Sequence, residues 1–94
     1  MDRDEMLAAV MQASKAHELS ELVASYRGYR THPNGATREI TIEVWDSLDP
    51  ADPYRVVVEA RDDEGRQTRC NGDRELKGAL AITHWHELDR ETPH

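Results

Sequence analysis

Histidine and cysteine are the residue types of this chain best suited to metal binding or nucleophilic catalysis, and their spacing favours neither. His84 and His86 flank Trp85. On a helix, two residues so spaced point about 200° apart, so their imidazoles cannot chelate one ion. Cys70 is the single cysteine, which excludes an intrachain disulfide, and no nearby histidine in the sequence would act as its base. We therefore predict no metal site and no cofactor.

Carboxylates are plentiful, but they cluster in segments that favour turns. Examples are segments 46–53 and 62–65, where acids stand together with proline or glycine. General acid–base catalysis needs carboxylates held in a cleft that separates their pKa values, whereas turn residues of this kind are solvated. A protein without enzymatic activity is the prediction that follows.

The segment 26–32 interleaves tyrosine with arginine and contains no acid. Tyrosine and arginine are enriched at protein interfaces, and the same pair of residue types also stacks on bases and contacts phosphates. The two tryptophans of the chain are further candidates for an interface, because their large rings supply contact area. The predicted binding residues are Tyr26, Arg27, Tyr29, Arg30, Trp45 and Trp85.

The charge balance favours a protein partner over nucleic acid. The 94 residues include 12 Lys and Arg against 19 Asp and Glu, and the net charge is -7. Binding to phosphate or to an anionic membrane needs a cationic surface. The acidic excess lies in 39–65, however, between two basic segments. A nucleic-acid-associated regulator therefore stays open as the alternative. It would use segment 26–38 together with Arg66, Arg69 and Arg74, with all of these arginines gathered on one side of the sheet.

These candidate residues must be positioned by strands in the middle of the chain. Segment 38–46 alternates apolar residues with polar ones, which predicts a strand with one buried face, and 54–61 repeats this pattern from Tyr54. By alternation, Trp45 falls on the polar face. A three-residue turn ending at Gly65 would place Asp62 opposite Arg66 and direct Cys70 into the core beside Val58.

The first 31 residues allow two interpretations. Met6, Leu7, Val10 and Met11 form a helical stripe, but the stripe through 19–26 is rotated by about 150°, so one straight helix cannot bury both. A strand over 22–31, paired with 37–46 across an Asn34-Gly35 turn, is the preferred interpretation. A longer helix is the alternative.

The last element is predicted as a helix that begins near Asp73 and continues through Leu88. Its apolar residues go nearly all the way round, which indicates a second apolar contact besides the sheet. Either the N-terminal helix or a second chain could supply that contact. Residues 89–94 are predicted to be a frayed tail.

Together these elements predict a single domain, 1–94, of the α+β class. It is a two-layer sandwich in which an antiparallel meander of three or four strands is covered on one face by the N- and C-terminal helices. An acidic start and the lack of a long apolar stretch predict a cytoplasmic protein that does not bind membranes. The predicted function is a small interaction module or accessory protein that acts through a homodimer or a partner interface.

Overall fold

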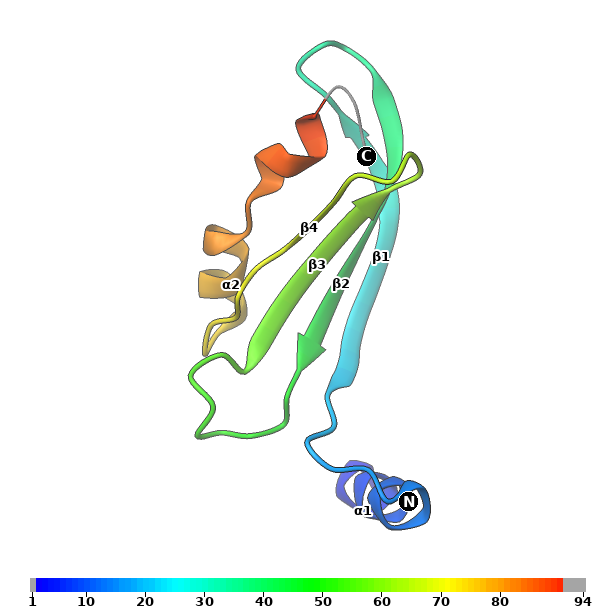
Figure 1. The fold of residues 1–94 in the computed structure, drawn as a ribbon, viewed down its shortest axis with the longest axis vertical. Coiled ribbons are helices and arrows are strands. Elements are labelled where there is room, and N and C mark those ends of the chain that lie inside the picture. Colours follow the sequence, from blue (N-terminus) through cyan, green and yellow to red (C-terminus); the bar gives the residue numbers. More distant parts are fainter. Residues whose placement is uncertain (1, 91–94) are drawn as a thin grey trace.

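The chain folds as a four-stranded antiparallel meander with helices before and after it, and this α+β order confirms the predicted fold class. The computed structural model describes residues 2–90. Strands follow one another across the sheet in chain order (Figure 1). The elements are α1 (Arg3–Ser14), β1 (Glu21–Thr31), β2 (Thr37–Asp46), β3 (Val56–Asp62), β4 (Gln67–Arg69), α2 (Leu76–Ile82) and the 3₁₀ helix η1 (Trp85–Asp89).

The first hairpin decides between the two interpretations of the N-terminal segment. β1 is a strand of 11 residues, and it pairs with β2 in antiparallel register with Thr31 opposite Thr37. Gly35 lies in the turn with φ +88°, the left-handed conformation that glycine adopts without strain. The preferred strand is confirmed, and the longer helix is wrong because α1 ends at Ser14.

The hairpin between β3 and β4 has the predicted register. In the turn between β3 and β4, Gly65 has φ +93° and the amide of Asp62 donates to the carbonyl of Arg66 at 2.9 Å. Ala60 therefore lies opposite Thr68. The thiol of Cys70 is buried and accepts a hydrogen bond from the amide of Val58 at 3.2 Å, as expected for a core cysteine.

The predicted third strand starts too early, because Tyr54 lies in the loop before β3 and is 61% exposed. Its amide donates to the carboxylate of Asp52, an Asx turn that holds the backbone out of the ladder. Two prolines in 50–53 also keep this segment from extending the strand.

The core lies between the inner face of the sheet and the C-terminal helices. Val44 and Val58 pack with Cys70 and with Ala79 of α2, and this group forms one of the two buried clusters. The other cluster joins Ile40 and Ala60 to Leu88 of η1. The buried side chains of this inner face therefore stand at positions 40, 44, 58 and 60, as the alternation predicts.

The C-terminal helix is not continuous, which corrects the prediction of one helix from near Asp73 to Leu88. α2 ends at Ile82, and Thr83, whose backbone is extended, separates it from η1. The hydroxyl of Thr83 donates to the carbonyl of Ala79 at 2.7 Å and stabilises the break. The break allows Ala79 of α2 and Leu88 of η1 both to be buried, whereas the large apolar residues of α2, Leu76, Leu80 and Ile82, remain exposed.

The N-terminal helix does not cover the sheet, contrary to the prediction that both helices pack on one face. α1 has no buried residue, and it lies beyond the end of the sheet at which β1 begins (Figure 1). Lys15 and Glu18 both have positive φ, and these two turns direct the chain away from the inner face. An ion pair of 2.5 Å between Arg3 and Glu21 links α1 to β1.

Asp89 and Arg90, the first two residues of the predicted frayed tail, are held by the fold. Asp89 closes η1, and the carbonyl of Arg90 accepts a hydrogen bond from the guanidinium of Arg66. The rest of that segment, 91–94, lies outside the described residues. Within 2–90, no helix is long and apolar enough to cross a membrane.

Candidate functional site

β1 forms one edge of the sheet along its whole length, and the predicted Tyr and Arg residues lie on it. Among the described strands only β2 pairs with it, and the opposite edge strand, β4, has three residues (Figure 1). A long edge strand presents a row of backbone groups that can pair with another chain. The longest unpaired backbone surface of the described sheet therefore coincides with the Tyr/Arg segment.

Backbone direction along β1 follows from one hydrogen bond at its end. The amide of His32 donates to the carbonyl of Ala36 at 2.8 Å, so this residue faces β2. Because successive residues of a strand direct their amides and carbonyls to opposite sides, even-numbered residues of 24–32 also face β2. The residues that face the open edge are Ser25, Arg27, Tyr29 and Thr31.

The side chains of β1 divide between the two faces of the sheet. Tyr26 lies opposite Ile42 and Arg30 opposite Arg38, on the same face as the core. Tyr26 is nevertheless 64% exposed. The C-terminal helices cover the opposite side of the sheet, over β3 and β4, and leave the β1 side open (Figure 1). Arg27 and Tyr29 lie on the outer face, where Tyr29 is 77% exposed. The structure thus places one tyrosine and one arginine on each face of the open edge.

Neither of the two tryptophans predicted to bind a partner lies on this edge. Trp45 is half-buried on the outer face, opposite Leu22 and Val57, at the end of the sheet where β1 begins. Trp85 packs against both core clusters, and its indole N–H donates to the carbonyl of Leu80 at 3.1 Å. Trp85 therefore serves the core, and the residues that share the edge are Tyr26, Arg27, Tyr29 and Arg30.

The arginines do not gather on one side of the sheet, which corrects the geometry expected for nucleic-acid binding. Arg27 and Arg69 lie on the outer face, where they pair with Glu39 at 3.5 Å and Glu59 at 3.3 Å. Arg30 lies on the inner face. Phosphate binding uses cationic groups that are free to release counterions, and these guanidinium groups already have carboxylate partners.

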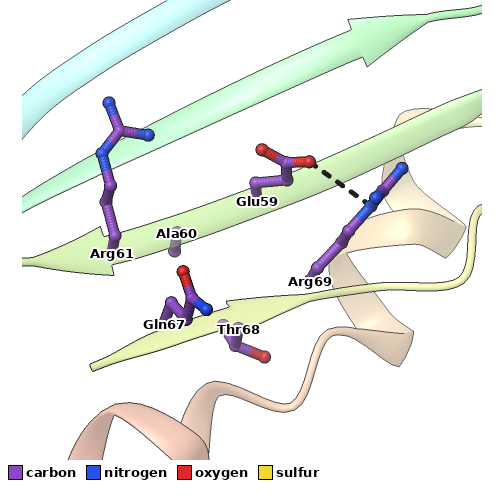
Figure 2. A pocket seen from close by; sticks show the side chains of 6 residues that line it. All are labelled: Glu59, Ala60, Arg61, Gln67, Thr68 and Arg69. Atoms are coloured by element: carbon purple, nitrogen blue, oxygen red, sulfur yellow. Dashed lines mark ion pairs between the residues drawn. The ribbon is translucent and has the colours of Figure 1, made fainter. Parts of the chain in front are cut away.

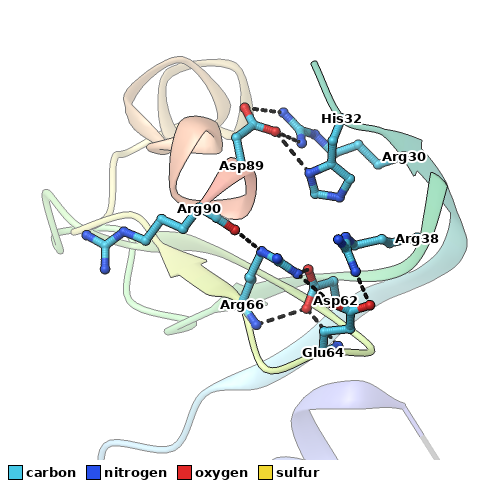
Figure 3. A network of polar contacts seen from close by, with 8 residues as sticks. All are labelled: Arg30, His32, Arg38, Asp62, Glu64, Arg66, Asp89 and Arg90. Atoms are coloured by element: carbon cyan, nitrogen blue, oxygen red, sulfur yellow. Dashed lines mark hydrogen bonds and ion pairs between the residues drawn. The ribbon is translucent and has the colours of Figure 1, made fainter. Parts of the chain in front are cut away.

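A polar network closes the end of the sheet at which β1 meets β2 (Figure 3). Arg30 donates two hydrogen bonds to the carboxylate of Asp89, and the imidazole Nδ1 of the buried His32 lies 3.2 Å from the same carboxylate. The hydrogen bonds from Arg30 hold the pKa of Asp89 below its usual range. These contacts hold η1 against the end of β1 and the hairpin turn that follows it.

The second half of the network surrounds Arg66, which is buried (Figure 3). Its guanidinium lies 3.0 Å from Glu64 and 3.3 Å from Asp62, and Arg38 also pairs with Glu64. Burial raises the pKa of Asp62, but hydrogen bonds from the amides of Glu64 and Arg66 outweigh it and leave that pKa lowered. Such fully paired charges stabilise a turn and do not present a reactive group.

A groove of about 440 Å³ lies along β3 and β4, but its charged side chains are already engaged. Its lining residues come from facing positions of these strands, and the carboxylate of Glu59 points toward the guanidinium of Arg69 (Figure 2). The pair lies 3.3 Å apart and leaves no carboxylate free for acid–base chemistry. The charged side chains that line this groove are thus paired with each other or with Glu43.

The histidines flanking Trp85 lie closer together than the helical prediction allows. Because η1 begins only at Trp85, the rings of His84 and His86 approach to 5.5 Å between centroids, where a helix would direct them apart. Zinc sites use three or four protein ligands. In 2–90, no three residues of the metal-ligating types come close enough together to hold an ion.

The sequence signal for the two-sided edge was present but incomplete. Alternation within 24–31 places residues 26 and 30 on one face and residues 27 and 29 on the other. What it missed is the pairing of Arg30 with Asp89, because nothing local links residues 59 positions apart. Comparison with known proteins found no family model, no curated protein and no solved structure that matches this chain.

Proposed function

We propose that this protein is a non-enzymatic interaction module that binds a protein segment along the open edge of β1. The observation that carries this proposal is the regular, unpaired edge over 24–31, with Tyr26 and Tyr29 exposed on its two faces. An extended segment that pairs with such an edge gains backbone hydrogen bonds, and its alternate side chains meet both tyrosines. Affinity then comes from the ladder and selectivity from the aromatic and guanidinium groups.

Protein sheets usually protect such an edge, and β1 carries few of the common protective devices. These are short strands, prolines, charged side chains (lysine above all) and bulges. β1 has one irregularity, between Leu22 and Ala24, and neither lysine nor proline, and the arginines of its regular part are paired with Glu39 and Asp89. The part from 24 to 31 therefore remains suited to pairing, and this supports an interface there.

A proline scan of the two edges tests the proposal. Tyr29→Pro removes an amide that faces the open edge of β1, and an edge position tolerates proline because no ladder bond to β2 is lost. Gln67→Pro is the matched control on the opposite edge: Cys70 donates to Val58, so by the same alternation the amide of Gln67 faces away from β3. The tagged chain is used to capture proteins from a lysate of its source cells, with an untagged second copy present.

We expect the wild type and Gln67→Pro to retain the same bound protein and Tyr29→Pro to lose it. Circular dichroism first establishes that both variants are folded. Equal capture by Tyr29→Pro would overturn the edge as the binding surface. A wild-type chain that captures nothing and scatters light as a monomer would overturn the proposed function itself.

A further inference from the structure

Gly28 occupies the middle of the regular part of β1, and no contact among residues 2–90 explains a glycine there. Its φ lies outside the left-handed region, and a Cβ built on it would meet no atom within 4 Å. Glycine weakens a strand interior because it gives up more backbone entropy and offers no side chain to pack. One recognised reason for such a glycine is the close approach of another backbone.

We propose that a second copy of this chain pairs with β1 in antiparallel register about a two-fold axis at Gly28, an inference that rests on the proposed function and names its partner. In this register Gly28 faces Gly28 of the second copy. Because the amide of Gly28 points toward β2, the two glycines form a non-hydrogen-bonded pair, in which the Cα atoms of antiparallel strands approach to about 4.5 Å. The glycines thus lie where the two backbones come closest.

The side chains of β1 are complementary to themselves in this register. Arg27 lies opposite Tyr29 of the second copy, and by symmetry Tyr29 lies opposite its Arg27, all on the outer face. On the inner face Arg30 and Tyr26 form the equivalent pairs. Arginine is attracted to the face of a tyrosine ring, so all four cross-strand pairs are favourable.

Neighbouring registers lack this complementarity. Two-fold symmetry requires that facing residues lie on the same face, so the axis passes through one residue of the strand. An axis through Arg27 would place Tyr29 opposite Ser25 and Tyr26 opposite Gly28, so no arginine would face a tyrosine across the interface. An axis through Tyr26 would draw Val23 into the ladder, at the irregularity between Leu22 and Ala24. The axis at Gly28 uses only the regular segment.

The arginines of the edge bring little net charge into this interface. Arg27 lies 3.5 Å from Glu39, and Arg30 is hydrogen-bonded to Asp89. Each copy therefore carries its own counter-charge beside the edge, and the two basic strands can approach without a large mutual repulsion. Pairing would join the two four-stranded sheets into one continuous sheet and cover the open edges of both.

Sedimentation over a concentration series, from about 1 µM to about 1 mM, tests the partner. We expect a monomer–dimer equilibrium in the wild type and in Gln67→Pro. Tyr29→Pro removes one edge amide and one ring from each copy, so two hydrogen bonds and the two Arg27–Tyr29 pairs are lost, and the dissociation constant should rise at least roughly thirtyfold. A wild type that stays monomeric throughout the series, or a dimer that Tyr29→Pro leaves unchanged, would overturn the proposal.

A cysteine scan tests the register. In a Cys70→Ser background, Gly28→Cys places two thiols at the axis, where the distance between Cα atoms suits a disulfide. We expect a mild oxidant to cross-link Gly28→Cys into dimers and to leave Tyr26→Cys and Arg27→Cys monomeric on a denaturing gel. Efficient cross-linking at residue 26 or 27 in place of 28 would overturn the axis.

Hydrogen exchange on the unaltered chain gives a readout that needs no variant. On raising the concentration, exchange should slow at the edge-facing amides of Arg27 and Tyr29 and stay unchanged at Gly28 and Arg30, which already face β2. Uniform protection would count against the proposal. If the chain is monomeric and yet captures another protein in a Tyr29-dependent way, this inference fails while the proposed function stands. If neither binding is seen, both fail.

Discussion

Leu88→Ala should remove a large part of the stability of this protein. Leu88 is fully buried, and it is the residue through which η1 packs on Ile40 and Ala60. Truncating a buried leucine to alanine costs about 3 kcal/mol, from lost transfer free energy and the cavity left behind. The whole free energy of unfolding of a chain this size is about 5–10 kcal/mol. The variant should therefore unfold at a much lower denaturant concentration.

Urea unfolding followed by tryptophan fluorescence measures this effect, because Trp85 packs against the same cluster. With a slope of about 1.5 kcal/mol per molar urea, the midpoint should fall by about 2 M. Leu80→Ala is the matched control, since Leu80 lies in the same helical layer but is 38% exposed, and it should cost about 1 kcal/mol. Equal midpoints for the two variants would refute the idea that η1 is anchored to the sheet by Leu88.

Three further outcomes are expected from the charged residues and turns. Gly65→Ala should lower the free energy of unfolding by about 1 kcal/mol in urea titration, because φ +93° strains any residue with a Cβ. A hydrogen bond from Arg55 lowers the pKa of Asp46, so its stabilising effect is present above the unfolded pKa of about 3.9 and is lost as the pH falls through the lower folded pKa. Thermal unfolding of the wild type should therefore depend more steeply on pH between about 5 and 2 than that of Asp46→Asn. Arg66→Met should lower the urea midpoint by leaving Asp62 without its guanidinium, and adding Asp62→Asn should restore part of the loss.

The sheet could be predicted from the sequence because its signals are local. Alternation of apolar and polar residues assigns the faces of β2 and β3, and the turn at Gly65 sets the register that brings Ala60 opposite Thr68. For β1, the rotation between two apolar stripes excluded only one straight helix, and the strand was preferred because its residues also alternate and it matches 37–46 in length. The fold class and the division of Tyr26 and Tyr29 between two faces lie within reach of such patterns.

The helices could not be predicted in the same way, because their ends depend on contacts far along the chain. The break at Thr83 is fixed by the need to turn both Ala79 and Leu88 toward one sheet, and a helical wheel assumes that no break occurs. The position of α1 beyond the sheet follows from two left-handed residues in its linker, and neither Lys15 nor Glu18 announces such a conformation by type.

By itself, the sequence indicated which residues could form an interface, namely a run of tyrosine and arginine that contains no acid. Only the tertiary structure decided that this run is an unpaired edge, since edge or centre depends on how many strands the meander holds and where the helices lie. It also decided that the arginines are paired and divided between faces, because ion pairs such as Arg30 with Asp89 join residues that only the folded chain brings together. Side-chain periodicity is local, whereas exposure and charge compensation are properties of the packed whole.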